Sequence, residues 1–199
     1  MLKKIDVPAP LDIENNCPRK KLFFQLSIPK NGVGSNTGLI LYIGGYGSQY
    51  DDLYTSKLLT YLSNEYDCIA VSVKYFGSDL YGNARAVPAT NFFENLKKRH
   101  GVIVTRHSVL AAEDLLTHTL EELRAGGITE LNYDCQAVIE SADYNSFGFL
   151  PAIDHLEVTW HVLNSYKPNR TRLYVLGTSC GGHIASMLLK FAPNTFRMI

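Results

Sequence analysis

The predicted strands of this chain are unbroken apolar runs rather than alternating ones. Residues 39–47 (LILYIGGYG) form one such run, which glycines interrupt at its end, and residues 68–75 (CIAVSVKY) form a second. Runs of this kind are typical of strands that are buried on both faces. Residues 173–176 (LYVL) predict a third buried strand, whereas residues 21–28 (KLFFQLSI) alternate in part and predict an earlier strand.

The segments between and after these predicted strands have apolar residues at helical spacing. Apolar residues recur at helical spacing in four segments, and two of the segments end at a breaker, Gly126–Gly127 or Pro168. We therefore expect helices over residues 51–64, 106–124, 153–163 and 184–191. Strands that alternate with helices predict an α/β fold, in which a mostly parallel sheet carries helices on both faces.

The irregular stretches of the chain suggest its domain organisation. We expect a single domain over residues 1–199, with loop-rich insertions at residues 76–104 and 127–146. Pro193 ends the last predicted helix, and residues 196–199 (FRMI) look like the opening of another strand. A central apolar strand left as an unpaired edge would be an aggregation hazard. We therefore expect the domain to be truncated after this point, and so incomplete at its C-terminus.

Composition narrows the class of protein. A chain of 199 residues can bury a full core, and its 19 basic and 19 acidic residues balance, so no charge argument favours a nucleic acid or a membrane surface. The apolar runs are too short to span a membrane. Residues 1–16 have lysines but no apolar stretch behind them, so they do not form a secretory signal. These observations predict a cytoplasmic protein.

The cysteines do not indicate a metal site or a disulfide framework. They lie far apart, without a CxxC pair, so no zinc site is expected, and nothing else in the chain predicts a cofactor. Two of them lie in segments that we expect to be buried, where a free thiol behaves as a small apolar group. The four cysteines are Cys17, Cys68, Cys135 and Cys180, and the two expected to be buried are Cys68 and Cys180.

The strongest chemical signal lies at residues 177–181 (GTSCG), directly after the last buried strand. This sequence fits the G-x-S-x-G nucleophile elbow, a strained strand-to-helix turn that presents a serine hydroxyl above a parallel sheet. Ser179 is then the nucleophile, and Gly177 and Gly181 allow the strand and the helix to approach. The positive end of the following helix favours an oxyanion. The alternative is a glycine-rich turn that has no catalytic role.

Two backbone amides are candidate donors to that oxyanion. Cys180 is a poor nucleophile candidate, because this register needs a small residue at Thr178, so we expect it to contribute its backbone N–H instead. Residues 44–48 (GGYGS) follow the first buried strand, where a second donor is expected, and the N–H of Tyr46 is favoured over that of Gly45. Gly44 would help this loop to turn. The alternative is again a loop that only reverses the chain.

The chain does not supply an evident general base. All histidines except His183 precede the serine, and His183 lies on the helix from which an elbow side chain points away. Asp154–His155 reads as the polar face of a helix, and the carboxylates before the elbow need no catalytic explanation. The sequence therefore predicts no complete serine triad. The groups considered are His100, His107, His118, His155, His161, Asp134, Asp143 and Asp154.

These motifs resemble the α/β-hydrolase superfamily over residues 22–199. More narrowly, residues 43–47 (IGGYG), 144–156 (YNSFGFLPAIDHL) and 177–193 (GTSCGGHIASMLLKFAP) look like a domain-of-unknown-function family typical of ε-proteobacteria such as Campylobacter and Helicobacter. The resemblance implies a nucleophile at Ser179 and oxyanion donors at Cys180 and Tyr46. It also implies that members continue through strands carrying an aspartate and then a histidine, which have no matching positions here.

The leading interpretation is the N-terminal part of a serine hydrolase that acts on an ester, thioester or peptide bond of a small molecule or peptide. Alone it would be inactive or weakly active, since the triad aspartate and histidine are missing. The stretches 76–104 and 127–146 would help to shape the substrate pocket. One alternative is a non-catalytic hydrolase-like protein, either a truncated product or a module that binds a ligand or partner. Another is half of a split enzyme, completed by a C-terminal half on a second polypeptide.

Overall fold

The computed structural model divides the chain into two compact units. The first unit contains residues 1–82 and 141–199, and the second contains residues 83–140. The residues described are 1–45, 47–80, 85–88, 91–101, 121, 123–127, 135–138 and 143–198.

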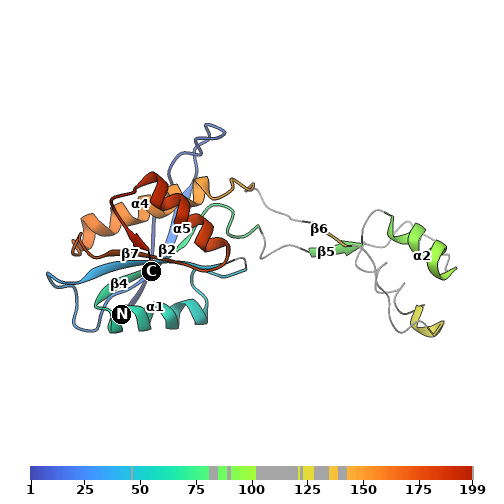
Figure 1. Ribbon diagram of the computed structural model, residues 1–199, viewed down its shortest axis with the longest axis horizontal. Coiled ribbons are helices and arrows are strands. Elements are labelled where there is room, and N and C mark those ends of the chain that lie inside the picture. The colour runs from blue at the N-terminus through green and yellow to red at the C-terminus, as the bar shows by residue number, and fades with distance from the viewer. Residues whose placement is uncertain are drawn as a thin grey trace. The chain divides into compact units, whose positions relative to one another are not determined.

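A six-stranded sheet forms the centre of the first unit (Figure 1). The neighbours β4, β3, β7 and β8 run parallel to one another, whereas β1 and β2 pair antiparallel at one edge. The expected mostly parallel sheet is therefore confirmed, and β1 is a strand that the sequence pattern did not reveal. In spatial order the strands are β1 (Leu2–Pro8), β2 (Lys21–Ser27), β4 (Cys68–Lys74), β3 (Gly38–Ile43), β7 (Leu173–Gly177) and β8 (Arg197–Met198).

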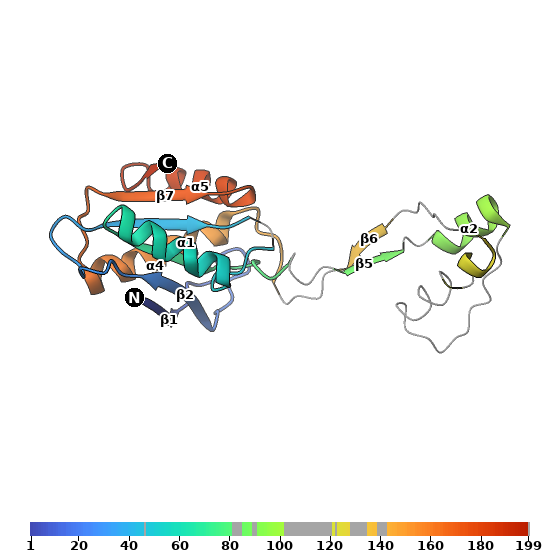
Figure 2. The same ribbon diagram turned by 90° about the horizontal axis from the view of Figure 1, so that it is seen from below.

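Helices cover both faces of this sheet, as predicted. Helix α1 (Leu53–Glu65) lies on one face, and α4 (Phe149–Tyr166) and α5 (Cys180–Phe191) lie on the other (Figure 1). Figure 2, seen from the side of α1, shows this helix in front of the strands. The residues of β3 divide between the two faces: Ile40 packs towards Leu59 of α1, whereas Leu41 belongs to the core beneath α4 and α5. Burial on both faces explains the unbroken apolar run.

Helix α4 is buried through a different face from the one its apolar residues predict. Trp160, one of the apolar residues at helical spacing in the predicted helix 153–163, is 59% exposed, whereas Asp154 and His155, expected on a polar face, are 0% and 1% exposed. Our interpretation of Asp154–His155 as a polar helix face is therefore wrong. The reason is tertiary, because a partner distant in sequence satisfies the carboxylate.

That partner is Arg19, which precedes β2. Its guanidinium binds Asp154 through two hydrogen bonds, Nη1 to Oδ1 at 2.6 Å and Nη2 to Oδ2 at 2.8 Å. The backbone N–H of Phe76 donates to Asp154 Oδ2 at 2.7 Å, and the Arg19 guanidinium also lies 4.9 Å from the centre of the Phe76 ring. A fully buried carboxylate is tolerated when charge and hydrogen bonds compensate it in this way. The pair joins α4 to two loops.

We expect Asp154→Asn to lower the free energy of unfolding by about 3 kcal/mol or more, because it leaves the Arg19 charge buried without its partner. The matched control is Asp6→Asn, since Asp6 pairs with Lys21 at 2.6 Å but both side chains are largely exposed. The control should cost less than about 1 kcal/mol. Urea unfolding followed by circular dichroism compares the two, and equal losses would contradict a special role for the buried pair.

The neighbouring His155 is a buried imidazole with one ring nitrogen unsatisfied. Its Nδ1 lies 2.7 Å from the carbonyl oxygen of Pro151 and therefore carries the proton that it donates. Its Nε2 has no hydrogen-bond partner within the described part of the chain. Burial lowers the pKa of His155 below the usual 6.5, since the charged form would lose its hydration.

This lowered pKa predicts a dependence of stability on pH. Below pH 6.5 the unfolded chain binds a proton at His155 that the folded chain does not, so stability is lost as the pH falls. The slope reaches up to about 1.4 kcal/mol per pH unit. His155→Leu should flatten the change in unfolding free energy between pH 7.5 and 5.5, measured with urea. His161→Gln, which removes a less buried histidine of α4, should leave the pH dependence of the unfolding free energy unchanged. An unchanged pH dependence in His155→Leu would contradict the role given to His155.

The second unit contains short elements in stretches that were predicted to be loop-rich. Strands β5 (Arg85–Pro88) and β6 (Cys135–Val138) pair antiparallel, and α2 (Phe92–His100) follows β5. Residues 123–125 are helical and lead into a turn at Gly126–Gly127, so the predicted end of the 106–124 helix is confirmed. The rest of that helix, residues 106–120 and 122, lies outside the described residues. In the described part of the chain, no helix is long and apolar enough to cross a membrane.

Candidate active site

The elbow motif forms a sharp turn between β7 and α5. Ser179 is exposed and has φ 54° and ψ −124°, in the left-handed half of φ space that non-glycine residues rarely occupy. Such a conformation costs on the order of 1–3 kcal/mol and persists only where the surroundings enforce it. Here the N–H of Thr178 donates to Ile43 O at 3.0 Å, and the N–H of Gly181 donates to Thr178 O at 2.9 Å. The turn is thus anchored to the end of β3.

The two outer glycines of the motif lie where a side chain would not fit. A Cβ on Gly177 would lie 2.5 Å from the carbonyl oxygen of Gly181, and a Cβ on Gly181 would lie 2.1 Å from that of Ile43. Both contacts are with backbone atoms, which cannot rotate away. The spacing of glycines in the motif therefore has a steric cause: α5 begins in contact with the ends of β3 and β7.

The glycine loop after β3 lies beside the serine. A Cβ on Gly45 would lie 3.0 Å from Ser179 Cβ and 3.5 Å from Ser179 Oγ, so the Gly45 backbone passes close to the hydroxyl. Gly44 is closed in by Ser48, whose Cβ would lie 2.6 Å from a Cβ at this position. Tyr46, the predicted second oxyanion donor, lies outside the described residues. Cys180 is partly exposed rather than buried as expected, because it starts the helix at the surface of the turn.

The described residues bring no base to Ser179. No described histidine or carboxylate forms a hydrogen bond with its hydroxyl. His183 Nε2 instead lies 2.9 Å from the carbonyl oxygen of Phe147, to which it donates, and His155 and His161 lie on α4. Asp143 accepts from the N–H of Gly77 at 2.9 Å. The predicted candidates outside the described residues are the side chain of His100 and residues His107, His118 and Asp134.

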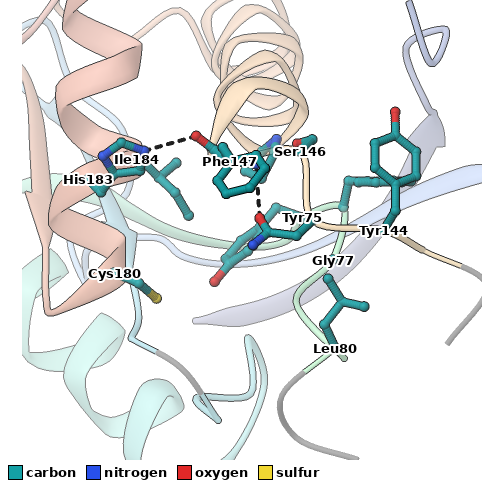
Figure 3. A pocket seen from close by; sticks show the side chains of 13 residues that line it. Tyr75, Gly77, Leu80, Tyr144, Ser146, Phe147, Cys180, His183 and Ile184 are labelled. Atoms are coloured by element: carbon teal, nitrogen blue, oxygen red, sulfur yellow. Dashed lines mark hydrogen bonds between the residues drawn. The ribbon is translucent and has the colours of Figure 1, made fainter. Parts of the chain in front are cut away.

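A cavity of about 100 Å³ adjoins the elbow (Figure 3). Cys180, the residue after Ser179, lines it together with His183 and Ile184 of α5. Its other walls come from residues 75–80 and 144–151, so the described ends of both predicted loop-rich stretches reach it. The pattern of apolar residues did not identify these walls. The sequence Ser146-Phe147-Gly148 is one local sign of a turn here. In the structure Phe147 and Gly148 both have positive φ, and this conformation presents the Phe147 carbonyl to His183.

Polar groups at the far wall of this cavity are tied to the protein. The Tyr144 hydroxyl lies 2.8 Å from Asp12 Oδ1 and 2.9 Å from Glu14 Oε2, so the two carboxylates share its single hydrogen. Desolvation and these hydrogen bonds raise the pKa of the Tyr144 hydroxyl, which therefore remains a neutral donor. Among the described residues no group of three or more His, Cys, Asp or Glu side chains could hold a metal ion.

The structure of this chain is similar to solved structures of known fold. A candidate dipeptidyl aminopeptidase IV from Bacteroides ovatus matches with a TM-score of 0.56 and 15% identity, over 99% of this chain and 20% of its own. A carboxyl esterase from Bacillus coagulans matches with a TM-score of 0.50 and 10% identity, over 99% of this chain and 43% of its own. The chain therefore has the α/β-hydrolase fold, and it spans less than half the length of either protein.

The family follows from the sequence itself. Residues 6–199 match the model of the family described as "Protein of unknown function (DUF2920)", so the chain belongs to this family. Among curated proteins no sequence match was found. The expected α/β-hydrolase fold and the expected membership of a domain-of-unknown-function family are thus confirmed.

The steric contacts at the elbow predict a contrast between adjacent glycines. Gly181→Ala should lower the free energy of unfolding by about 2–3 kcal/mol, because its Cβ would overlap the Ile43 carbonyl oxygen. Gly182→Ala is the matched control, since its Cβ would meet nothing closer than 3.8 Å. Within a helix this change should stabilise by about 0.5–1 kcal/mol. Urea unfolding measures both, and equal effects would contradict the close approach of α5 to β3.

Proposed function

We propose that this chain supplies the nucleophile and the oxyanion site of a serine hydrolase that cleaves an ester, thioester or peptide bond. The observation that carries the proposal is the backbone of Ser179, held at φ 54° between β7 and α5, with the Gly45 backbone beside its hydroxyl. A turn that served only to reverse the chain would place glycine here, since glycine adopts positive φ without strain. A serine kept at this energetic cost favours a role for its hydroxyl.

In the proposed reaction Ser179 Oγ attacks the substrate carbonyl carbon while its proton passes to a general base. The carbonyl oxygen becomes an oxyanion, held by the backbone N–H groups of Cys180 and Tyr46 at the positive end of α5. Collapse of this intermediate expels the alcohol, thiol or amine with a proton and leaves an acyl-Ser179 ester. Water then attacks that ester, which releases the acid and restores the serine hydroxyl.

The general base and its orienting acid come from outside the described residues in this proposal. They belong either to other parts of the enzyme or to a second polypeptide that completes it. Without them the chain would retain only the weak catalysis that an oxyanion hole provides. A cytoplasmic location and the ε-proteobacterial distribution of the family stay predictions from the sequence.

A fluorophosphonate probe tests the nucleophile, because it forms a covalent bond with a reactive serine. We expect slow labelling at Ser179, since the proposed base lies outside the described residues, and mass spectrometry of the digested chain locates the label. Ser179→Ala should reduce the labelling rate by at least about 100-fold. Ser179→Gly should do the same and also raise the free energy of unfolding by about 1 kcal/mol, since glycine relieves the strain at this position.

Two control variants separate this role from general damage to α5. Ser186→Ala removes another serine of the same helix, whose hydroxyl donates to Gly182 O at 2.9 Å, and should label at the original rate. Cys180→Ala should also label normally, because the proposal uses its backbone N–H and not its thiol. Labelling that persists in Ser179→Ala, or that disappears in Cys180→Ala with the fold intact, would refute the assignment.

A further inference from the structure

The cavity beside the elbow has the position of a substrate pocket, an argument that rests on the proposed function. Cys180 lines the cavity and is covalently joined to Ser179, and His183 and Ile184 lie about one helical turn further along α5. Ser179 itself does not line the cavity, but a group attached to a carbonyl at Ser179 would lie next to its Cys180 wall. All the lining residues belong to the unit formed by residues 1–82 and 141–199.

The described walls of this cavity lack carboxylates, lysine and arginine. None of the 13 residues that line it is Asp, Glu, Lys or Arg. Leu80, Ile184 and Pro151 supply aliphatic surface, and Tyr75 and Phe76 supply aromatic surface. A charged group placed here would lose its hydration without a counterion, which is costly.

The polar side chains of the cavity already have partners in the protein. His183 Nε2 donates to the Phe147 carbonyl at 2.9 Å, as Figure 3 shows. Asn145 Oδ1 accepts from the Phe147 N–H at 2.9 Å, and Ser146 Oγ accepts from the Leu150 N–H at 3.1 Å. The single hydrogen of the Tyr144 hydroxyl is shared between Asp12 and Glu14 and does not point a donor at the cavity. A ligand here would meet mainly apolar contacts.

The volume limits the size of that ligand. An apolar cavity of about 150 Å³ accommodates benzene, with its six carbons. By proportion, the cavity of about 100 Å³ accommodates roughly four carbons. Leu80 is only 7% exposed and lines the cavity away from α5, beside Gly77 (Figure 3).

We propose that this cavity binds the short, uncharged alkyl group of the substrate, next to the carbonyl that Ser179 attacks, and that Leu80 determines its length. The substrate is then an ester, thioester or amide with about four carbons on one side of the scissile bond. This alkyl group belongs either to the acyl part or to the leaving group of the substrate. In both cases it is short, apolar and uncharged.

The first test measures acylation of the 199-residue chain by p-nitrophenyl acetate, butyrate and octanoate. Butyrate should react at least about 10-fold faster than octanoate, because each methylene that does not fit changes the rate by roughly 10–200-fold. A parallel series of butyl and octyl acetates, followed by acetate release, identifies a pocket for the leaving group. Faster reaction of the four-carbon compound in either series supports the proposal. Hydrolysis without this preference in both series overturns it.

Variants of Leu80 test its role in the length limit. Leu80→Ala should reduce the gap between butyrate and octanoate to less than about 3-fold, and Leu80→Phe should move the optimum to acetate. The control is Leu62→Ala, because Leu62 is also 7% exposed but packs in the core beneath α1. It should lose similar stability and keep the original length preference. If Leu80→Ala does not fold, the Leu80→Phe variant decides, and an unchanged optimum in it overturns the role of Leu80.

A binding experiment decides the matter even if no ester is hydrolysed. Butyramide, butyrate and butylammonium are added at millimolar concentration to the Ser179→Ala chain, and the methyl NMR signals of Leu80 and Ile184 are followed. Butyramide alone should shift these signals. Equal shifts by the charged compounds, or no shift by butyramide, overturns the proposal. Absence of fluorophosphonate labelling together with butyramide binding would instead refute the serine nucleophile and leave the ligand class of the cavity intact.

Discussion

The start of α5 lies so close to the end of β3 that position 181 has no room for a side chain. A Cβ there would lie 2.1 Å from the Ile43 carbonyl oxygen, and one at Gly177 would lie 2.5 Å from the Gly181 oxygen. This contact brings the helix N-terminus, the ends of two parallel strands and the loop after β3 to one point. The strained conformation of Ser179 persists because the surrounding backbone is fixed by these contacts.

A second constraint holds the wall of the adjoining cavity. Arg19 and the N–H of Phe76 both bind the carboxylate of Asp154, and Asp154 lies in the second turn of α4. The loop that leaves β4 is thereby tied to the same helix whose first turn contributes Pro151 to the cavity. A buried ion pair of this kind adds less stability than its short distances suggest, since both charges lose their hydration. It does define one arrangement of three distant segments.

The repeating units of the fold were predictable from local pattern. Three unbroken apolar runs became β3, β4 and β7, because a strand buried on both faces has no polar side to reveal. Strand β1 was missed because only Val7 of it is buried and it pairs at the sheet edge. In the second unit, β5 and β6 are each too short for a periodicity to appear, and α2 has a low apolar content.

The orientation of α4 shows where pattern alone fails. This helix is apolar on most sides, so its sequence does not select which face is buried, and Trp160 is exposed while Asp154 is not. The choice depends on Arg19, which is distant in sequence, and no local rule anticipates such a pairing. The two loop-rich stretches were expected to shape a pocket, but the individual residues of its walls were not predictable, because they combine segments from three parts of the chain.

The sequence by itself determined the strand-to-helix turn at residues 177–181, because a tight turn leaves a local trace in the spacing of its glycines. It also determined the alternation of buried strands and amphipathic helices. Only the tertiary structure decided that Gly45 lies against Ser179, that Asp154 and His155 are buried, and that a small uncharged cavity opens beside Cys180. These features depend on atoms brought together from distant segments, and packing of the sheet is what brings them together.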